Sequence, residues 1–290
     1  QITQNTIPAP IGYDGFIDIE RADGSVFKVG IDNIHLEEDS AQMTHEEKAS
    51  KINYNRAGVP LLELVTTPCL HDVNDVITFL EYIRSVYQYT EISDADSKKG
   101  QIRCDVNVSL SNTDELGTKV EIKNVNSFSG VRDAINYEVQ RQLDLINNGE
   151  QDKIEQETRR FDDTTGTTIR MRSKVDAIDY KYFVEPNIPK IKINEEWKEK
   201  IFKSIPELPY ERKNNYMSKY GLSSYDANIL VKEKKIALYF EECIKLGIDA
   251  KIAANWIIST ILGYISKENI EIDECFVTPS RLSVIISNLS

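Results

Sequence analysis

The stretch QIRCDVNVSL, residues 101–110, alternates apolar with polar side chains, and it is the best guide to the fold. Successive side chains of an extended strand point to opposite faces. One face would carry Cys104, Val106, Val108 and Leu110, and the other Arg103, Asp105, Asn107 and Ser109. The stretch TKVEIKNV, residues 118–125, alternates likewise, with Val120 and Ile122 opposed to Lys119, Glu121 and Lys123. Together they predict a sheet with one apolar and one mixed-charge face, either an ordinary antiparallel sheet wetted on one side or a surface suited to phosphate and metal.

The segments around this pair predict further strands and two long helices. Strands are expected at 15–22 and 25–38 around the turn ADGS, at 59–65 as a buried strand, and in a hairpin of QETRRFD and TTIRMRSK. One helix is expected after Asp72 and another between Ser127 and Gly149. The apolar stripe of the second helix is predicted to be Val131, Ile135, Val139, Leu143 and Ile146.

Beyond Glu195 the sequence reads as short amphipathic helices separated by Gly or Pro. We therefore expect an α+β chain of two domains, 1–194 and 195–290, which the length of 290 residues permits. The chain begins without a methionine and ends inside a helical pattern that has no C-cap. These ends predict an internal segment of a longer protein.

Composition narrows the classes of function. A net charge of -12 argues against a general polyanion binder, although a local basic patch could still grip RNA. The 4 cysteines form no CxxC pair, which predicts reduced thiols in a cytosol-like compartment. No run of 18 apolar residues is present, so no membrane partner is expected. The sequence also contains no P-loop, GxGxxG or nucleophile-elbow motif.

Acidic residues gather in HLEED, residues 35–39, and in VPLLELV, residues 59–65. Glu63 lies in an otherwise apolar strand, where a carboxylate must be paired, protonated or bound to a metal. An ion pair with an arginine such as Arg56 is the simpler interpretation. Glu37 and Glu38 point to opposite faces of a strand, so without a bulge at most one of them can share a site with Glu63 and Asp105. Acids without a histidine or cysteine cluster favour Mg²⁺.

A magnesium site formed by acids usually implies phosphates, and phosphates require basic partners. The predicted hairpin supplies Arg159, Arg160, Arg170 and Arg172, which otherwise would form a solvated charged hairpin. His35 precedes the acids and could orient them. For His45 and His71 we expect structural roles rather than a role at the acidic site.

Many collinear stretches then resemble the B subunit of the tRNA-dependent amidotransferases, the GatB family. They are HLEED, NYNRAGVPLLELV, GQIRCDVNVSL, GTKVEIKNVNSF, QETRRFDDTTGTTIRMRSK and DYKYFVEP. The resemblance implies a glutamine-synthetase-like antiparallel-sheet cradle domain followed by an all-helical domain. It also implies an ATP- and Mg²⁺-dependent reaction in which the carboxylate of Glu-tRNA(Gln) or Asp-tRNA(Asn) is phosphorylated. Ammonia from the partner amidase subunit then displaces the phosphate. The resemblance further implies a small third subunit in the assembly and a location in the cytoplasm or an organelle matrix.

Carried over by motif, the resemblance assigns catalytic roles to Glu38, Glu63 and Asp105 and metal-binding roles to Glu37, Glu38, Glu63 and Asp105. Phosphate-binding candidates, chosen by strand face, are Arg103, Lys123, Arg159 and Arg160. Two other classes of function remain open. The chain could be a non-catalytic scaffold that docks partners and tRNA, or an unrelated Mg²⁺-dependent phosphoryl-transfer enzyme.

The sequence departs from the family at several places. The N-terminal motif GLEVHVEL, which supplies a Glu and a His, and the C-terminal tail domain are absent, so we expect this segment alone to be inactive. Ser40 and Gln42 stand where the family has the AGK that follows HLEED. Lys181 and Val184 replace the arginine and the first proline of DYRYFPEP, and lysine cannot make a bidentate guanidinium contact.

Overall fold

The computed structural model describes residues 10–46, 49–97, 99–173 and 191–289. The chain divides into two compact units, the first made of Gln1–Phe79 and Cys104–Ile193, the second of Leu80–Arg103 and Asn194–Ser290. The boundary between the two units at Ile193 and Asn194 lies beside the predicted boundary after residue 194, but residues 80–103 also belong to the second unit. The helix α1 (Val73–Tyr89) begins in the first unit and ends in the second.

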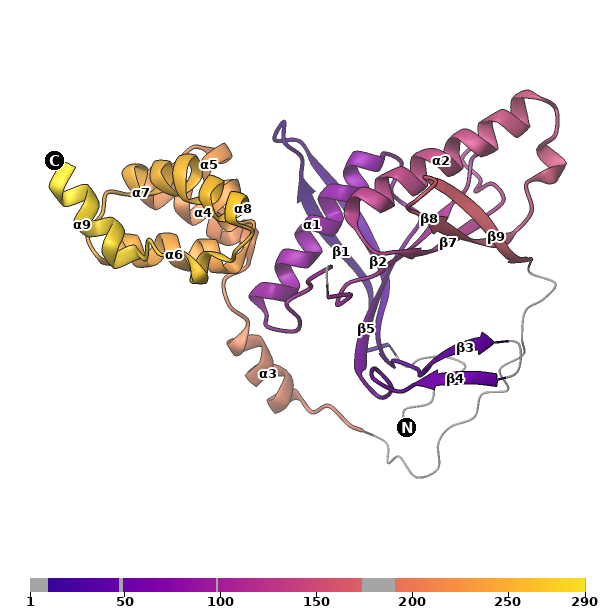
Figure 1. The fold of residues 1–290 in the computed structure, drawn as a ribbon, viewed down its shortest axis with the longest axis horizontal. Coiled ribbons are helices and arrows are strands. Elements are labelled where there is room, and N and C mark those ends of the chain that lie inside the picture. Colours follow the sequence, from indigo (N-terminus) through magenta and orange to yellow (C-terminus); the bar gives the residue numbers. More distant parts are fainter. Residues whose placement is uncertain (1–9, 47–48, 98, 174–190, 290) are drawn as a thin grey trace. The chain divides into compact units, whose positions relative to one another are not determined.

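The first unit holds the sheets that the described residues form (Figure 1). A three-stranded sheet has the order β1-β2-β5, a separate hairpin pairs β3 with β4, and a four-stranded sheet has the order β6-β7-β8-β9. The strands are β1 (Gly12–Glu20), β2 (Val26–Glu38), β3 (Gln42–Glu46), β4 (Ala49–Asn53), β5 (Pro60–Thr66), β6 (Cys104–Val108), β7 (Val120–Val125), β8 (Glu157–Asp162) and β9 (Thr167–Ser173). The class is α+β, as predicted.

The four-stranded sheet is mixed rather than purely antiparallel. The strands β7 and β8 are parallel, with Val120 opposite Glu157 and Lys123 opposite Arg160. Parallel neighbours need a long crossover, and the helix α2 (Phe128–Asn147) supplies it. The sequence correctly predicted the antiparallel β6–β7 and β8–β9 pairs but not the parallel junction between them.

The helix α2 begins and ends at its predicted signals. The Ser127 side chain accepts a hydrogen bond from the Gly130 amide at 3.0 Å, and Gly149 adopts φ +73° just beyond the C-terminus. The predicted apolar stripe is correct at Val131, which is fully buried, but wrong at Leu143 and Ile146, which are each 39 % exposed. The buried Ala134, Glu138 and Gln142 each precede a residue of the predicted stripe by one position, which is a rotation of about 100° around the helix. The buried positions are Gly130, Val131, Ala134, Glu138 and Gln142.

The sequence did not predict the hairpin of β3 and β4, in which Met43 lies opposite Ile52. One expectation in the first unit also needs correction. The strand β5 is not buried. It lies at the edge of its sheet, its residues are half-buried or exposed, and the Glu63 side chain is 49 % exposed.

The second unit is helical beyond residue 194. Its described elements are α3 (Glu195–Ser204), α4 (Pro209–Tyr220), α5 (Ser224–Val231), α6 (Lys234–Lys245), α7 (Ala250–Trp256), the π-helical turn η3 (Ile257–Ile261), α8 (Leu262–Glu268) and α9 (Pro279–Leu289). Two short 3-10 turns, η1 (Gln151–Lys153) in the first unit and η4 (Ile272–Glu274) in the second, complete the described helical elements. The helices α5 and α6 are separate because Glu233, between them, is extended.

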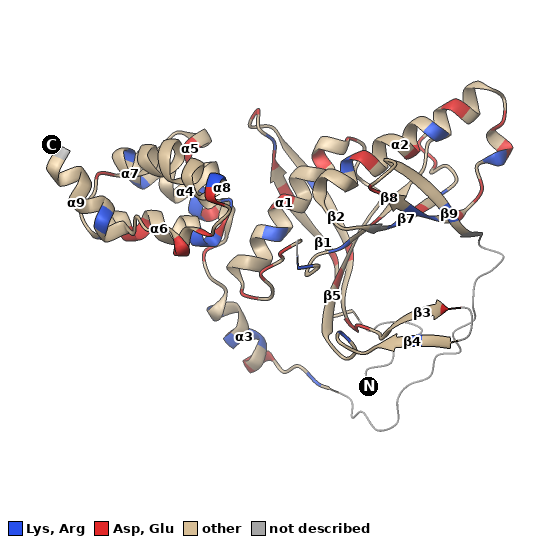
Figure 2. Ribbon diagram, viewed as in Figure 1, with Lys and Arg blue, Asp and Glu red and all other residues tan. Residues whose placement is uncertain are grey.

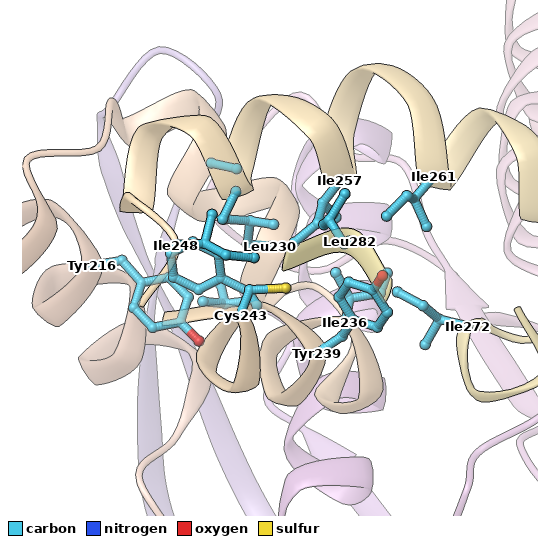
Figure 3. Close-up of a cluster of buried hydrophobic side chains, with 14 of the residues drawn as sticks. Tyr216, Leu230, Ile236, Tyr239, Cys243, Ile248, Ile257, Ile261, Ile272 and Leu282 are labelled. Carbon is cyan, nitrogen blue, oxygen red and sulfur yellow. The ribbon is translucent and has the colours of Figure 1, made fainter. Parts of the chain in front are cut away.

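The core of the second unit joins α4 through α9. Figure 3 shows Tyr216, Cys243, Ile257 and Leu282 gathered in one apolar cluster. The second half of α1 belongs to this unit, where the Tyr89 hydroxyl donates to the Val231 carbonyl at 3.1 Å. None of the helices in the described residues combines the length and apolar composition needed to span a bilayer.

Candidate functional site

A histidine and two glutamates converge on neighbouring strands of the three-stranded sheet. His35 on β2 lies directly opposite Glu63 on β5, and Glu37 lies two residues along β2. The His35 Nε2 atom is 3.3 Å from Glu37 Oε1 and 3.5 Å from Glu63 Oε2. Within the described part of the chain, a ring nitrogen of the histidine and one oxygen of each carboxylate lie within 4.8 Å of one another.

A β-bulge in β2 sets the face on which these side chains lie. Ile31 pairs with Thr66, but Asn33 pairs with Val65, so one extra residue of β2 is inserted between them. Strict alternation from the buried Ile31 would place His35 and Glu37 on the face of the apolar core. The bulge shifts the alternation by one residue and brings both onto the face of Glu63.

The electrostatics of the cluster call for a positive charge. Partial burial raises the pKa of Glu63, and the nearby Glu37 carboxylate raises it further, while His35 lowers it. His35 is 5 % exposed, and its Nδ1 lies 2.7 Å from Asn33 Oδ1. Because a carbonyl oxygen only accepts, Nδ1 donates to Asn33, and Nε2 faces the two carboxylates.

Either a proton or a cation can relieve this arrangement. An imidazole nitrogen and two carboxylate oxygens form a donor set that fits a divalent cation. The set differs from the predicted four carboxylates, because His35 is a ligand candidate and not merely a residue that orients the acids. The sequence did not reveal this because a lone histidine is usually structural, and only its register opposite Glu63 places it in the cluster.

Glu38 does not join the cluster. It points to the opposite face of β2 from Glu37, and a Cβ placed on Gly58 would stand 3.6 Å from Glu38 Oε1. The expected alternation of Glu37 and Glu38 therefore holds, and Glu37 is the residue that faces Glu63. Arg56 forms an ion pair with Asp39, its Nε lying 3.0 Å from Asp39 Oδ2.

Asp105 lies on the neighbouring sheet, near enough for its carboxylate to raise the pKa of Glu63. Its own partner is Lys123, whose Nζ is 3.2 Å from Asp105 Oδ2 and 3.3 Å from Glu121 Oε1. Burial opposes the charge on Lys123, but the two acids outweigh it and raise the pKa of the ammonium group. The Thr158 hydroxyl donates to Glu121 Oε2 at 2.9 Å. A polar ladder thus runs from β6 to β8.

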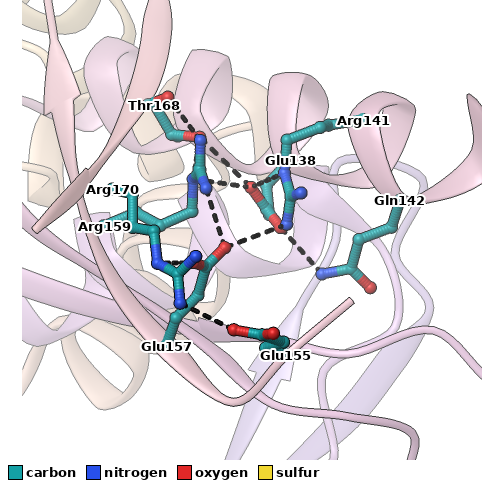
Figure 4. Close-up of polar contacts among 8 residues, drawn as sticks. All are labelled: Glu138, Arg141, Gln142, Glu155, Glu157, Arg159, Thr168 and Arg170. Carbon is teal, nitrogen blue, oxygen red and sulfur yellow. Dashed lines mark hydrogen bonds and ion pairs between the residues drawn. The ribbon is translucent and has the colours of Figure 1, made fainter. Parts of the chain in front are cut away.

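The residues predicted to bind phosphate do not all lie on the same face of the four-stranded sheet. Arg160 is exposed and is the register partner of Lys123, so these two cations lie side by side on the face of Asp105. Arg159 lies on the other face, where its guanidinium donates to Glu157 and Thr168 (Figure 4). That occupied, part-buried guanidinium does not fit the predicted phosphate contact. Arg103 is exposed and belongs to the second unit.

Charged residues of both signs lie along the strands of the first unit (Figure 2). Arg170 is bound by Glu155 and Glu157 and does not join the candidate site. Ser40 is exposed, and Gln42 begins β3. Lys181 and Val184, at which the sequence departs from the family pattern, lie outside the described residues.

Comparisons with known proteins agree with the resemblance of the motifs. Residues 1–199 match the family described as GatB/GatE catalytic domain, and residues 238–290 match the GatB domain. The chain is 42 % identical over 280 residues to the B subunit of the aspartyl/glutamyl-tRNA(Asn/Gln) amidotransferase of Staphylococcus carnosus, covering 96 % of this chain and 58 % of that protein. It is 43 % identical over 289 residues to the B subunit of the Elusimicrobium minutum amidotransferase, covering 99 % and 59 %. The chain therefore spans less than two thirds of the length of the curated relatives it matches.

Proposed function

This chain belongs to the GatB/GatE catalytic-domain family, and from that membership we propose that it forms part of an ATP-dependent, tRNA-dependent amidotransferase. The substrates are Glu-tRNA(Gln), Asp-tRNA(Asn) or both, and the products are Gln-tRNA(Gln) and Asn-tRNA(Asn). The side-chain carboxylate attacks the γ-phosphorus of ATP, ADP leaves, and ammonia then displaces phosphate from the acyl phosphate. A partner amidase subunit supplies the ammonia, and a further small subunit completes the assembly. The reaction belongs where tRNA is charged, in the cytoplasm or an organelle matrix.

The observation that carries this proposal is the convergence of His35, Glu37 and Glu63. These three side chains are suited to hold a divalent cation. The two carboxylates suit Mg²⁺, and we propose that ion because the family membership implies it, with the His35 imidazole as an additional ligand. When bound, the cation neutralises charge on the phosphates and on the acceptor carboxylate. Both reactants are anionic, so without positive groups they would repel each other.

Lys123 of the polar ladder and the neighbouring Arg160 would bind the phosphates. Lys123 and Arg160 present adjacent positive charges, and Asp105 and Glu121 hold the Lys123 ammonium between them. Arginine can bind a phosphate group with two parallel hydrogen bonds, whereas lysine acts as a point charge. We therefore assign phosphate contact to Lys123 and Arg160 and leave Arg159 out.

A non-catalytic scaffold that docks partners and tRNA is the second candidate. A scaffold has no need for two carboxylates beside a buried imidazole, an arrangement that costs free energy when no cation is bound. The cluster therefore favours catalysis over docking alone.

The test uses the full-length protein assembled with its partner proteins. We expect amide formation that depends on ATP and misacylated tRNA, and we expect Glu63→Gln to abolish it while the partners still co-purify. Asp18→Asn is the matched control, because it removes an exposed carboxylate from β1 of the same sheet and should leave the rate unchanged. Normal activity of Glu63→Gln would refute the catalytic role. Loss of assembly in Glu63→Gln would mean that the glutamate is structural.

A further inference from the structure

A second cluster of charged side chains is buried between α2 and the strands β8 and β9 (Figure 4). Glu138 is completely buried, and Gln142, Glu157 and Thr168 are nearly so. Burying charges is costly unless every group is paired, and a mixed ionic cluster is often no more stabilising than apolar residues of the same size. The cluster therefore calls for an explanation other than stability.

Directed hydrogen bonds join the helix to both strands. Glu138 accepts from Arg141 Nη2 at 2.7 Å and from the Thr168 hydroxyl at 3.2 Å. Arg159 donates from Nε to the Thr168 hydroxyl and from Nη2 to the Thr168 carbonyl, both at 2.8 Å. Its Nη1 donates to Glu157 at 2.7 Å. One residue of the helix is thus connected to a defined position on each strand.

The strand β8 has a single apolar residue, Phe161, that marks its buried face, and this side chain is 5 % exposed. Arg159 and Arg160 are neighbours of identical type, and a slip of one residue would exchange the faces on which they lie. The ladders do not prevent such a slip strongly. Only four residue pairs join β8 to β7, and the pairing with β9 shifts between Thr158 and Arg159.

The buried acids add a second constraint to that of Phe161. Glu138 and Glu157 lie on the helix side of the sheet, where they bind Arg159 together with Arg141 and Arg170. Arg160 and Thr158 are thereby left on the open face, beside Lys123 and Glu121. An apolar pocket would bury an aliphatic side chain but would not demand an arginine at this one position.

We propose that Glu138 is a positioning residue that fixes the register of β8 together with the buried Phe161, by selecting Arg159 for burial and so placing Arg160 beside Lys123. Glu138 touches no reactant and acts through Arg159 and Thr168. The register role stands on the contacts alone, whereas its consequence for phosphate binding rests on the proposed function.

The first experiment measures the register directly. The full-length assembly is treated with phenylglyoxal, an arginine reagent, and modified residues are located by peptide mass spectrometry. In the wild type we expect Arg160 to react about tenfold faster than Arg159, because the Arg159 guanidinium is held by charge-assisted hydrogen bonds. In Glu138→Gln we expect reciprocal changes, with Arg159 gaining reactivity and Arg160 losing it.

A rise at Arg159 alone would overturn the proposal, because it would report a loosened pocket and not a shifted strand. Unchanged reactivity of both arginines would also overturn it. Circular dichroism establishes that each variant is folded. If Glu138→Gln does not fold, Thr168→Val decides by the same criteria, because it removes the hydroxyl that joins Arg159 to Glu138 and leaves all charges in place.

The second experiment tests the consequence for phosphate binding. In the assembled enzyme, Glu138→Gln and Arg160→Ala should each raise the KM for ATP about tenfold, with a smaller change in kcat. The double variant should be no worse than either single variant, because both remove the same contact. Effects that multiply would overturn the proposed link between the two residues. If the wild type shows no ATP-dependent amide formation, the proposed function fails, while the arginine-modification result still decides the register role.

Discussion

Replacing Glu37 by glutamine should stabilise the metal-free site and abolish its response to cations. The variant removes one of two carboxylates whose oxygens stand within 4.8 Å of each other. At that separation two unit charges repel by about 3.5 kcal/mol at an effective dielectric constant of 20, and by about 0.9 kcal/mol in water. The Glu63 side chain is 49 % exposed, so the lower value, about 1 kcal/mol, is appropriate.

Hydrogen exchange of the peptides that contain β2 and β5 measures this effect locally, with and without added Mg²⁺. Without metal, Glu37→Gln should slow exchange by up to about fivefold, because a gain of about 1 kcal/mol changes an equilibrium by that factor. In the wild type, Mg²⁺ at about 100 times its Kd should add protection worth about 2.7 kcal/mol. Glu37→Gln should gain none of that protection.

Glu38→Gln is the comparison that the structure offers. It removes the same charge one residue away, but on the opposite face of β2, so the protection by Mg²⁺ should persist. Faster exchange of Glu37→Gln in the absence of metal would refute the repulsion between the two carboxylates. Equal loss of the Mg²⁺ response in both variants would refute the assignment of ligands, because both glutamates would then bind the cation as the sequence motif implied.

Two further predictions concern the helical unit. Leu282→Ala should lower the free energy of unfolding by about 2.7–5 kcal/mol in thermal or urea denaturation, because the fully buried Leu282 side chain would leave a cavity. Val284→Ala on the same helix should change it by no more than about 0.5 kcal/mol, because Val284 is 60 % exposed. Equal losses in the two variants would contradict the packing of α9. Burial raises the pKa of the Cys243 thiol to about 12, so only about one molecule in ten thousand carries the thiolate at about pH 8. Iodoacetamide should therefore label Cys243 only after the chain unfolds. Rapid labelling of the folded chain would contradict the burial of this thiol.

Local chemistry explains which parts of the fold could be predicted from sequence. The second long helix starts at Ser127 and ends before Gly149 because a hydroxyl cap and a left-handed glycine act within a few residues of each end. The buried face of that helix was predicted correctly at Val131 but wrongly at Leu143 and Ile146, because the prediction followed the apolar residues. The sheet instead buries Glu138 and Gln142, and Glu138 finds its partners Arg159 and Thr168 in distant strands.

The candidate site was likewise predicted only in part from the sequence. Alternation alone established that Glu37 and Glu38 face apart, and it singled out Glu63 and Asp105 as unusual acids. It could not decide which glutamate meets Glu63, because a single bulge between Ile31 and Asn33 reverses the answer. Nor could it give His35 a role as a ligand, since that role depends on its pairing with a residue of another strand, β5.

By itself the sequence determined the α+β class, the polar face of the β6–β7 pair and the family. These follow from periodicities and motifs that are local to a few residues each. Tertiary structure alone decided that β7 and β8 run parallel, that Arg160 and not Arg159 lies beside Lys123, and that His35 completes the acidic cluster. Each of these depends on strand register, which is fixed by contacts between segments far apart in the chain and which a shift of one residue would invert.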